Sequence, residues 1–102
     1  MAFPTGSNIQ KLQERAIDGI QHDAAVDCWF TATGETIPRL AKVKGAEEEI
    51  ITIKDIQTFK VEQKFYGGTH CRKHWCRAEM NGIVKEFLLL FHVDDCKWRI
   101  VI

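Results

Sequence analysis

The stretch "THCRKHWCRAEMNGIVKEFLLLFHV", from Thr69 to Val93, contains the clearest structural signal in the chain. Asn81-Gly82 lies between two runs of residues that are typical of β-strands, and this dipeptide favours the type I′ turn of a two-residue hairpin. Such a turn fixes the register of the hairpin, because Met80 must then pair with Ile83. The further predicted pairs are Ala78 with Lys85, Cys76 with Phe87, His74 with Leu89, and Arg72 with Phe91.

A second turn, at Asp94-Asp95, is predicted to join this hairpin to the last strand, "CKWRIVI". If Val93 pairs with Cys96, the two registers, which come from separate turns, place the same side chains on one face of the sheet. The pairs across the second turn are Phe91 with Trp98, Leu89 with Ile100, and Phe87 with Ile102. These six side chains are the predicted core.

The opposite face of the middle strand is also apolar, because it carries Val84, Leu88 and Leu90 beside Trp75. A strand that is apolar on both faces is expected to be covered on both. An N-terminal helix over residues 8–24 is the predicted cover. Its apolar stripe recurs at three- and four-residue steps and consists of Ile9, Leu12, Ala16, Ile17 and Ile20.

Upstream of the hairpin, residues from Cys28 onward change to the two-residue period of β-strands, with breaks at Gly34, Gly45 and Gly67-Gly68. The 102 residues are enough for one domain with its own core. The predicted fold is α+β and mainly β, with the helix at about 8–24 and a β-meander at about 28–102. The meander is bent and antiparallel, and it forms a small SH3-like barrel or half-barrel.

The overall charge gives no sign of a polyanionic partner, because 14 Lys and Arg residues balance 14 Asp and Glu residues. The opening "MAFPTGS" lacks the basic and apolar regions of a signal peptide, and the longest apolar run, Phe87–Phe91, is too short to cross a membrane. The expected location is therefore cytoplasmic, with the four cysteines as free thiols and no contact with a membrane.

Two histidines and two cysteines lie within Thr69–Cys76, which raises the question of a metal site or a Cys/His enzyme. On a strand, Cys71 faces the opposite way from His74 and Cys76, so these side chains do not converge as zinc ligands must. Cys71 is expected opposite His92, the right residue types for a nucleophile and its base, but no third group completes the site. The sequence predicts no metal, no cofactor and no catalytic residue.

The predicted binding site consists of His70, Arg72, His74 and Trp98, which share the core-facing side at one end of the sheet. An arginine is rarely buried without a partner, so this end forms either a basic, aromatic-lined pocket or a splayed sheet with Arg72 stacked over Trp98. A pocket of this kind would suit an anionic ligand. The alternatives are a solvated sheet end and an ion pair of Arg72 with Glu35 or Glu62.

Nucleic-acid binding is a second functional interpretation, because small β-barrels present aromatic and basic residues to single strands. The candidates are Trp29, Phe65, Tyr66, Trp75, Arg72, Lys73 and Arg77. The last strand, with no strand after it, is predicted to be an exposed edge through which a homodimer pairs.

Four segments resemble short proteins of Clostridia-like Firmicutes for which no activity is known. They are "CWFTATGETIPRLAKVKG", "ITIKDIQ", "WCRAEMNGIVKEFLLLF" and "DDCKWRIVI". The resemblance covers Trp29 to Ile102 and leaves the predicted helix outside it. It implies a bacterial, intracellular protein with a small β-domain, and it assigns no catalytic residue.

These observations favour a non-enzymatic binding or interaction module with an anion or small-ligand site at one end of the sheet. Its partner is an anionic small molecule or another protein. The first alternative is a nucleic-acid-associated or regulatory small β-barrel. The second is a Cys/His enzyme or a metal-binding protein.

Overall fold

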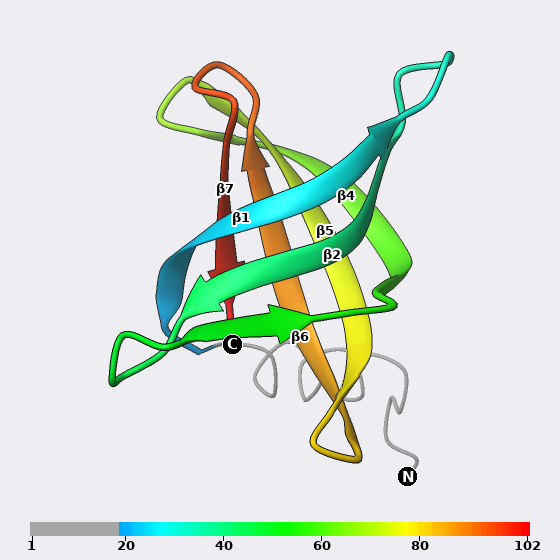
Figure 1. The fold of residues 1–102 in the computed structure, drawn as a ribbon. Helices are drawn as coiled ribbons and strands as arrows, with labels where there is room; N and C mark the ends of the chain where they lie inside the picture. Colours follow the sequence, from blue (N-terminus) through cyan, green and yellow to red (C-terminus); the bar gives the residue numbers. More distant parts are fainter. Residues whose placement is uncertain (1–18) are drawn as a thin grey trace, which may run out of the picture.

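A computed structural model describes residues 19–102, which form one sheet of seven antiparallel strands that curls into a half-barrel (Figure 1). The strands are β1 (Gln21–Phe30), β2 (Thr36–Lys44), β3 (Ile50–Ile53), β4 (Gln57–Tyr66), β5 (Thr69–Met80), β6 (Ile83–His92) and β7 (Lys97–Val101). Their order across the sheet is β3-β2-β1-β7-β6-β5-β4. From residue 19 onward, no helix has the length and apolar character needed to span a bilayer.

The hairpin of β5 and β6 has the predicted register throughout, from Met80 opposite Ile83 to Arg72 opposite Phe91. Asn81 and Gly82 both have positive φ, 54° and 80°, which confirms the type I′ turn. This one turn therefore sets the register of the longest ladder in the described sheet, the one between β5 and β6.

The register of β6 and β7 is also confirmed for Phe91 with Trp98 and for Leu89 with Ile100. The predicted pair of Phe87 with Ile102 is wrong, because the ladder ends at Leu88 opposite Val101. Ile102 instead exchanges backbone hydrogen bonds with Ile20 at 3.3 and 3.4 Å. Its side chain is 40% exposed and lies outside the core.

The strand β1 corrects the N-terminal prediction, because residues 21–24 are extended and not helical. Residues 8–18 of the predicted helix lie outside the described residues. In β1 the half-buried side chains alternate with exposed ones, and the half-buried set is His22, Ala24, Val26 and Cys28. Pairing with β2 on one side and β7 on the other stabilises this segment as a strand.

The strand β7 is not an edge of the sheet, which contradicts the sequence prediction. It lies between β6 and β1, and Gln21 to Ala24 pair with Val101 to Trp98. The start of β1, which was expected to be helical, therefore pairs with the edge of β7 that was expected to be free. The edges of the sheet are β3 and β4.

The two edge strands approach each other at one end of the half-barrel. There the Ile56 N–H, in the segment between β3 and β4, donates to the Arg39 carbonyl of β2 at 3.2 Å. Each side of this junction has a β-bulge, since Arg39 is the extra residue between β2 and β1, and Phe59 is the extra residue between β4 and β5. Bulges bend strands, so these two help the sheet to close at this point.

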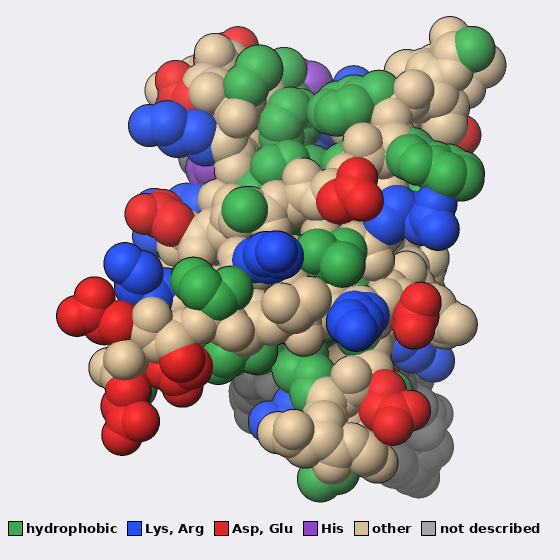
Figure 2. All heavy atoms as spheres, in the orientation of Figure 1, with side chains coloured by type: hydrophobic (Ala, Val, Ile, Leu, Met, Phe, Trp, Pro, Cys, Tyr) green, Lys and Arg blue, Asp and Glu red, His purple; other side chains and the backbone are tan. Residues whose placement is uncertain are grey.

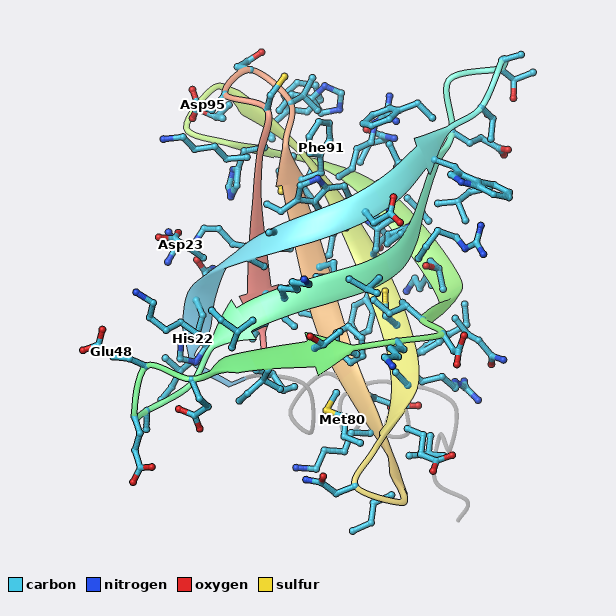
Figure 3. All side chains as sticks on the ribbon, in the orientation of Figure 1. His22, Asp23, Glu48, Met80, Phe91 and Asp95 are labelled. Atoms are coloured by element: carbon cyan, nitrogen blue, oxygen red, sulfur yellow. The ribbon has the colours of Figure 1, made fainter. Side chains whose placement is uncertain are left out.

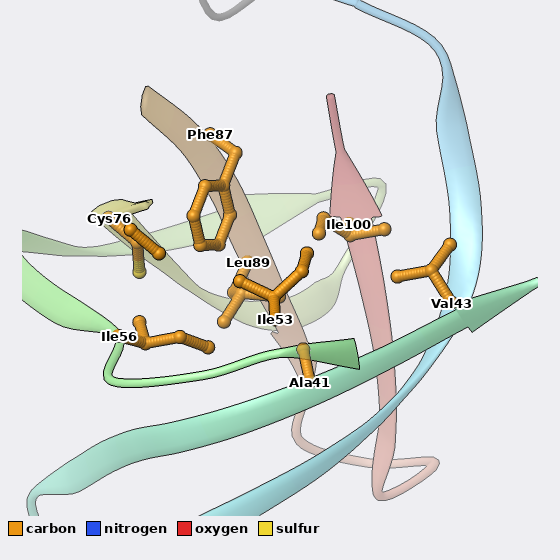
Figure 4. Packing of buried hydrophobic residues seen from close by; sticks show 9 residues of the cluster. Ala41, Val43, Ile53, Ile56, Cys76, Phe87, Leu89 and Ile100 are labelled. Atoms are coloured by element: carbon orange, nitrogen blue, oxygen red, sulfur yellow. The ribbon is translucent and has the colours of Figure 1, made fainter. Parts of the chain in front are cut away.

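The core fills the closed end of the half-barrel (Figure 4). Phe87, Leu89 and Ile100 are fully buried, as the two hairpin registers predicted. They pack with side chains from the other half of the sheet, namely Ala41, Val43, Ile53 and Ile56, and with Cys76 and Ala78 of β5. The interpretation of Cys76 as a small core residue is confirmed.

A second apolar cluster lies on the outer face of the sheet, as predicted from the apolar pattern of β6. Trp75, Leu88 and Leu90 are buried there together with Cys71 and Val101. Val84 lies on this face as predicted, since it has the same alternation as Leu88 and Leu90, but its side chain is 65% exposed near the Asn81-Gly82 turn and does not belong to the buried cluster.

Candidate functional site

A cleft opens beyond the Ile56–Arg39 junction, where β2 and β4 diverge. It has a volume of about 580 Å³, which is within the range of small-molecule sites. One wall comes from the β1–β2 turn and the start of β2, and the other from β4 and β5. The lining residues are Gly34, Glu35, Thr36, Ile37, Thr58, Val61, Gln63 and Arg72.

Aromatic side chains gather at this open end. Figure 2 shows hydrophobic side chains between the β6–β7 turn and the β1–β2 turn, at the top of the view. Phe91 lies there, near the end of β6 (Figure 3). It contacts Phe30 edge to face at 5.7 Å between ring centroids and Trp98 at 4.8 Å. Phe30 is 60% exposed, so this end of the half-barrel has no lid of its own within residues 19–102.

Among residues 19–102, Arg72 is the only cation that lines the cleft. Its Nη1–H donates to the Gly34 carbonyl at 2.8 Å, which joins β5 to the β1–β2 turn. Its Nε–H is buried and has no hydrogen-bond partner in the described part of the chain. Among the same residues, no carboxylate lies within 4.0 Å of the guanidinium. The charge of Arg72 is therefore left without a paired anion.

The alternative partners predicted for Arg72 lie elsewhere. Glu62 pairs with Lys60 and Lys64 at 3.8 and 3.9 Å on the outer face of β4. Glu35 lines the same cleft but makes no ion pair with Arg72. The cation–π contacts found within residues 19–102 do not include Arg72, so the predicted stacking over Trp98 is not formed.

His74 lies behind the wall of the cleft and is fully buried. Its Nδ1–H donates to the Leu89 carbonyl at 3.2 Å, so its Nε2 accepts from the Thr36 hydroxyl at 2.6 Å. Burial lowers the pKa of His74, since the imidazolium form is poorly solvated there. His74 is thus a neutral residue that positions Thr36, and Thr36 itself lines the cleft.

His70 and Trp98, the other two predicted site residues, do not line this cleft. His70 is stacked on Phe65 at 4.8 Å and hydrogen-bonds to the Gln63 side chain. Trp98 packs against His74 at 5.3 Å and lines a separate hollow of about 420 Å³ beside Ala24 and Lys97. Of the four predicted residues the structure therefore places only Arg72 in the cleft, with His74 directly behind it.

The sequence interpretation missed most of the cleft. One half of it could have been found, because Gly67-Gly68 is a two-residue turn that pairs Tyr66 with Thr69 and so places Gln63 opposite Arg72. The other half, Gly34 to Ile37, comes from the distant β1–β2 turn. No local pattern in the sequence places that turn beside β4.

Cys71 and Cys76 lack the features of a nucleophile. Cys71 lies opposite His92, as predicted, but no hydrogen bond joins the two side chains in the described residues. Burial raises the pKa of the Cys71 thiol and raises that of Cys76 to about 12, which keeps both protonated near neutral pH. All four cysteines are free. No three His, Cys, Asp or Glu side chains between residues 19 and 102 are grouped as metal ligands.

The residues considered for nucleic-acid binding are divided between surfaces. Trp75 is buried on the outer face, with Lys73 and Lys60 over its ring at 4.7 and 5.1 Å. Arg39 covers the Trp29 ring in the same way at 4.2 Å. Rings already covered by the protein's own cations are poor stacking platforms for bases.

Comparison of the chain with protein-family models, curated proteins and solved structures found no match. The geometry of the cleft therefore has to support any functional assignment. It offers one guanidinium, one carboxylate, two hydroxyls and an amide beside two apolar side chains, which is a set suited to binding a polar ligand.

Proposed function

We propose that this protein binds a small organic anion in the cleft between β2 and β4. The observation that carries the proposal is Arg72, a guanidinium that lines a cleft of about 580 Å³ without a carboxylate partner among residues 19–102. An arginine at such a position forms charge-assisted, often bidentate hydrogen bonds with carboxylate or phosphate oxygens.

The other lining residues define the ligand class. Thr36, Thr58 and Gln63 supply hydrogen-bond donors and acceptors, whereas Ile37 and Val61 supply an apolar surface. The ligand is therefore an anion with an apolar or planar body, such as an aromatic carboxylate or a nucleoside monophosphate. Glu35 adds a negative charge at the same cleft, so a small ligand with one or two negative charges fits better than a polyanion.

The test is a calorimetric titration of the protein with four probes. They are benzoate, inorganic phosphate, adenosine monophosphate and a short single-stranded oligonucleotide. The Arg72→Gln variant keeps an amide donor but loses the charge, and it should weaken binding of the small anions by roughly ten- to a hundredfold. Arg77→Gln is the matched control, because Arg77 lies on the same strand but on the outer face, paired with Glu86 at 3.9 Å.

The Glu35→Gln variant is a second test, in which the affinity for anions should change in the opposite direction. Removing this exposed carboxylate from the cleft should strengthen anion binding about two- to fivefold at low salt. The absence of binding by all four probes, or equal losses in the Arg72 and Arg77 variants, would overturn the proposal. Binding of the oligonucleotide alone, with a steep salt dependence, would favour the nucleic-acid alternative.

Three further parts of the sequence interpretation remain proposals. The SH3-like comparison is supported by the small size and the curled antiparallel sheet, although seven strands are present in residues 19–102. The bacterial origin and the cytoplasmic location are supported by the resemblance described above.

A further inference from the structure

The outer edge of β4 is the longest free strand edge in the described sheet. β4 has ten residues and pairs only with β5, whereas the other edge strand, β3, has four. The beginning of β4 is occupied by the bulge at Phe59 and by the Ile56–Arg39 junction. Residues 60–66 beyond it leave backbone N–H and C=O groups unpaired, which is a template for a further strand.

The side chains of this free segment are unusual for an edge. Val61 and Phe65 face the concave side of the sheet, yet they are 47% and 71% exposed. On the opposite face Lys60, Glu62 and Lys64 alternate in charge. Charged side chains, lysine above all, and bulges protect strand edges from pairing, and this segment has both. Its charges alternate in sign, however, so the same segment of a second copy can pair with them, and its other face is apolar.

We propose that β4 pairs with β4 of a second copy of this chain, antiparallel and centred on Gln63. In this register Gln63 lies opposite its own equivalent. On the concave face, Val61 of each chain lies opposite Phe65 of the other. On the outer face, Glu62 of each chain lies opposite Lys64 of the other. Apolar pairs and opposite-charge pairs are the cross-strand contacts that stabilise antiparallel sheets, and the two-fold symmetry doubles each of them.

The neighbouring registers are less favourable. A pairing centred on Glu62 places Glu62 opposite Glu62 and Lys60 opposite Lys64, which are like charges. A pairing centred on Val61 extends to the bulge at Phe59 and to the end of β4 that β2 already approaches. Of these three registers, only the one centred on Gln63 stays within the free segment and forms apolar pairs on the concave face and opposite-charge pairs on the outer face.

The pairing also concerns the ligand cleft. Val61 and Gln63 belong to the paired segment and line the cleft as well, so the second copy would border the cleft along β4. The dimer rests on the edge of β4 alone and does not depend on the anion site. Arg72 lies one strand away, on β5.

The test reverses the charge at position 62 or 64 and measures dimerisation by analytical ultracentrifugation over a range of protein concentrations. The wild type should show a concentration-dependent dimer. Glu62→Lys and Lys64→Glu should each weaken dimerisation by roughly tenfold or more, because each creates two like-charge pairs across the symmetric interface. An equimolar mixture of the two variants should restore dimers. In a mixed dimer, positions 62 and 64 are both lysine in one chain and both glutamate in the other, so each of the two cross-strand pairs again joins opposite charges.

Glu79→Lys, an exposed change of the same sign on the outer face of β5, is the control and should leave dimerisation unchanged. A wild type that stays monomeric at all concentrations would overturn the inference. So would a mixture that stays monomeric while each variant is folded by circular dichroism. A Lys64→Glu variant that dimerises like the wild type would overturn the register. If the wild type is monomeric but still binds anions, the dimer inference is wrong and the proposed function still holds.

Discussion

The two ends of the half-barrel are built from the same strands but differ in what their inward-facing side chains do. At the closed end, Ile53 and Ile56 from the far edge pack against Phe87 in the core. At the open end, Val61 and Phe65 also face inward from β4, yet both are exposed. Alternation along a strand thus determines the direction of a side chain, and closure of the sheet determines whether that side chain is buried.

The largest expected effect contrasts one phenylalanine from each end. Phe87→Ala should reduce the free energy of unfolding by about 3–5 kcal/mol, because it leaves a cavity in the closed core. At protein concentrations low enough to keep the chain monomeric, Phe65→Ala should change it by about 0.5 kcal/mol or less, since that ring is then largely in solvent. Urea denaturation of both variants measures the difference, and equal losses would show that the open end is closed in solution.

A smaller effect is expected at the boundary between the two ends. Thr36 lines the cleft, and its hydroxyl satisfies the buried Nε2 of His74. Thr36→Val keeps the shape but leaves that nitrogen without a donor, which should reduce the free energy of unfolding by about 1–2 kcal/mol. The control is Thr52→Val on the exposed face of β3. If the two variants are equally stable, the hydrogen bond has no part in holding the cleft wall.

The smallest effect is a pH dependence that His74 adds to stability. Because its pKa is lowered in the folded state, the unfolded chain takes up a proton at a higher pH than the folded chain. This contribution to stability is complete above the ordinary histidine pKa of about 6.5 and is lost as the pH falls below it, by at most about 1.4 kcal/mol per pH unit. Urea midpoints between pH 7.5 and 5 measure it.

The His74→Gln variant provides the comparison for this pH dependence. Glutamine does not titrate, so the variant should lose this component of the slope while the titrations of the other groups remain. The same slope in the variant and the wild type would assign the pH dependence to those other groups.

The sequence allowed the central half of the sheet to be predicted, because its turns are short. Asn81-Gly82 set the pairing of Arg72 with Phe91 and of Cys76 with Phe87, and the turn at Asp94-Asp95 set most of the next pair of strands. In both cases the partners are close in sequence, so one turn fixes the register. The end of β1 from Cys28 onward was predicted as β, but residues 21–27 were not. Their half-buried side chains are short or polar, and their pairing with β7 joins residues that are far apart in the sequence.

The site was harder to predict than the sheet. Arg72 was identified because a charged residue on the apolar side of a strand is visible in the hairpin register. Glu35 was considered only as one of two possible ion-pair partners of Arg72, and Ile37 was not placed beside it, since the position of both residues depends on the curl of the sheet and on the bulges at Arg39 and Phe59. Such curvature arises from the whole sheet and has no local signature in the sequence.

The most direct test of the ligand site is a backbone-amide NMR titration of the wild type and the Arg72→Gln variant with adenosine monophosphate. The largest shift changes in the wild type should fall on residues 34–37, 58, 61, 63 and 72, which line the cleft. They should be strongly reduced in the variant. Changes centred elsewhere, for example around Trp29 and Arg39, or changes of equal size in the variant, would contradict the assignment of the open end as the binding site.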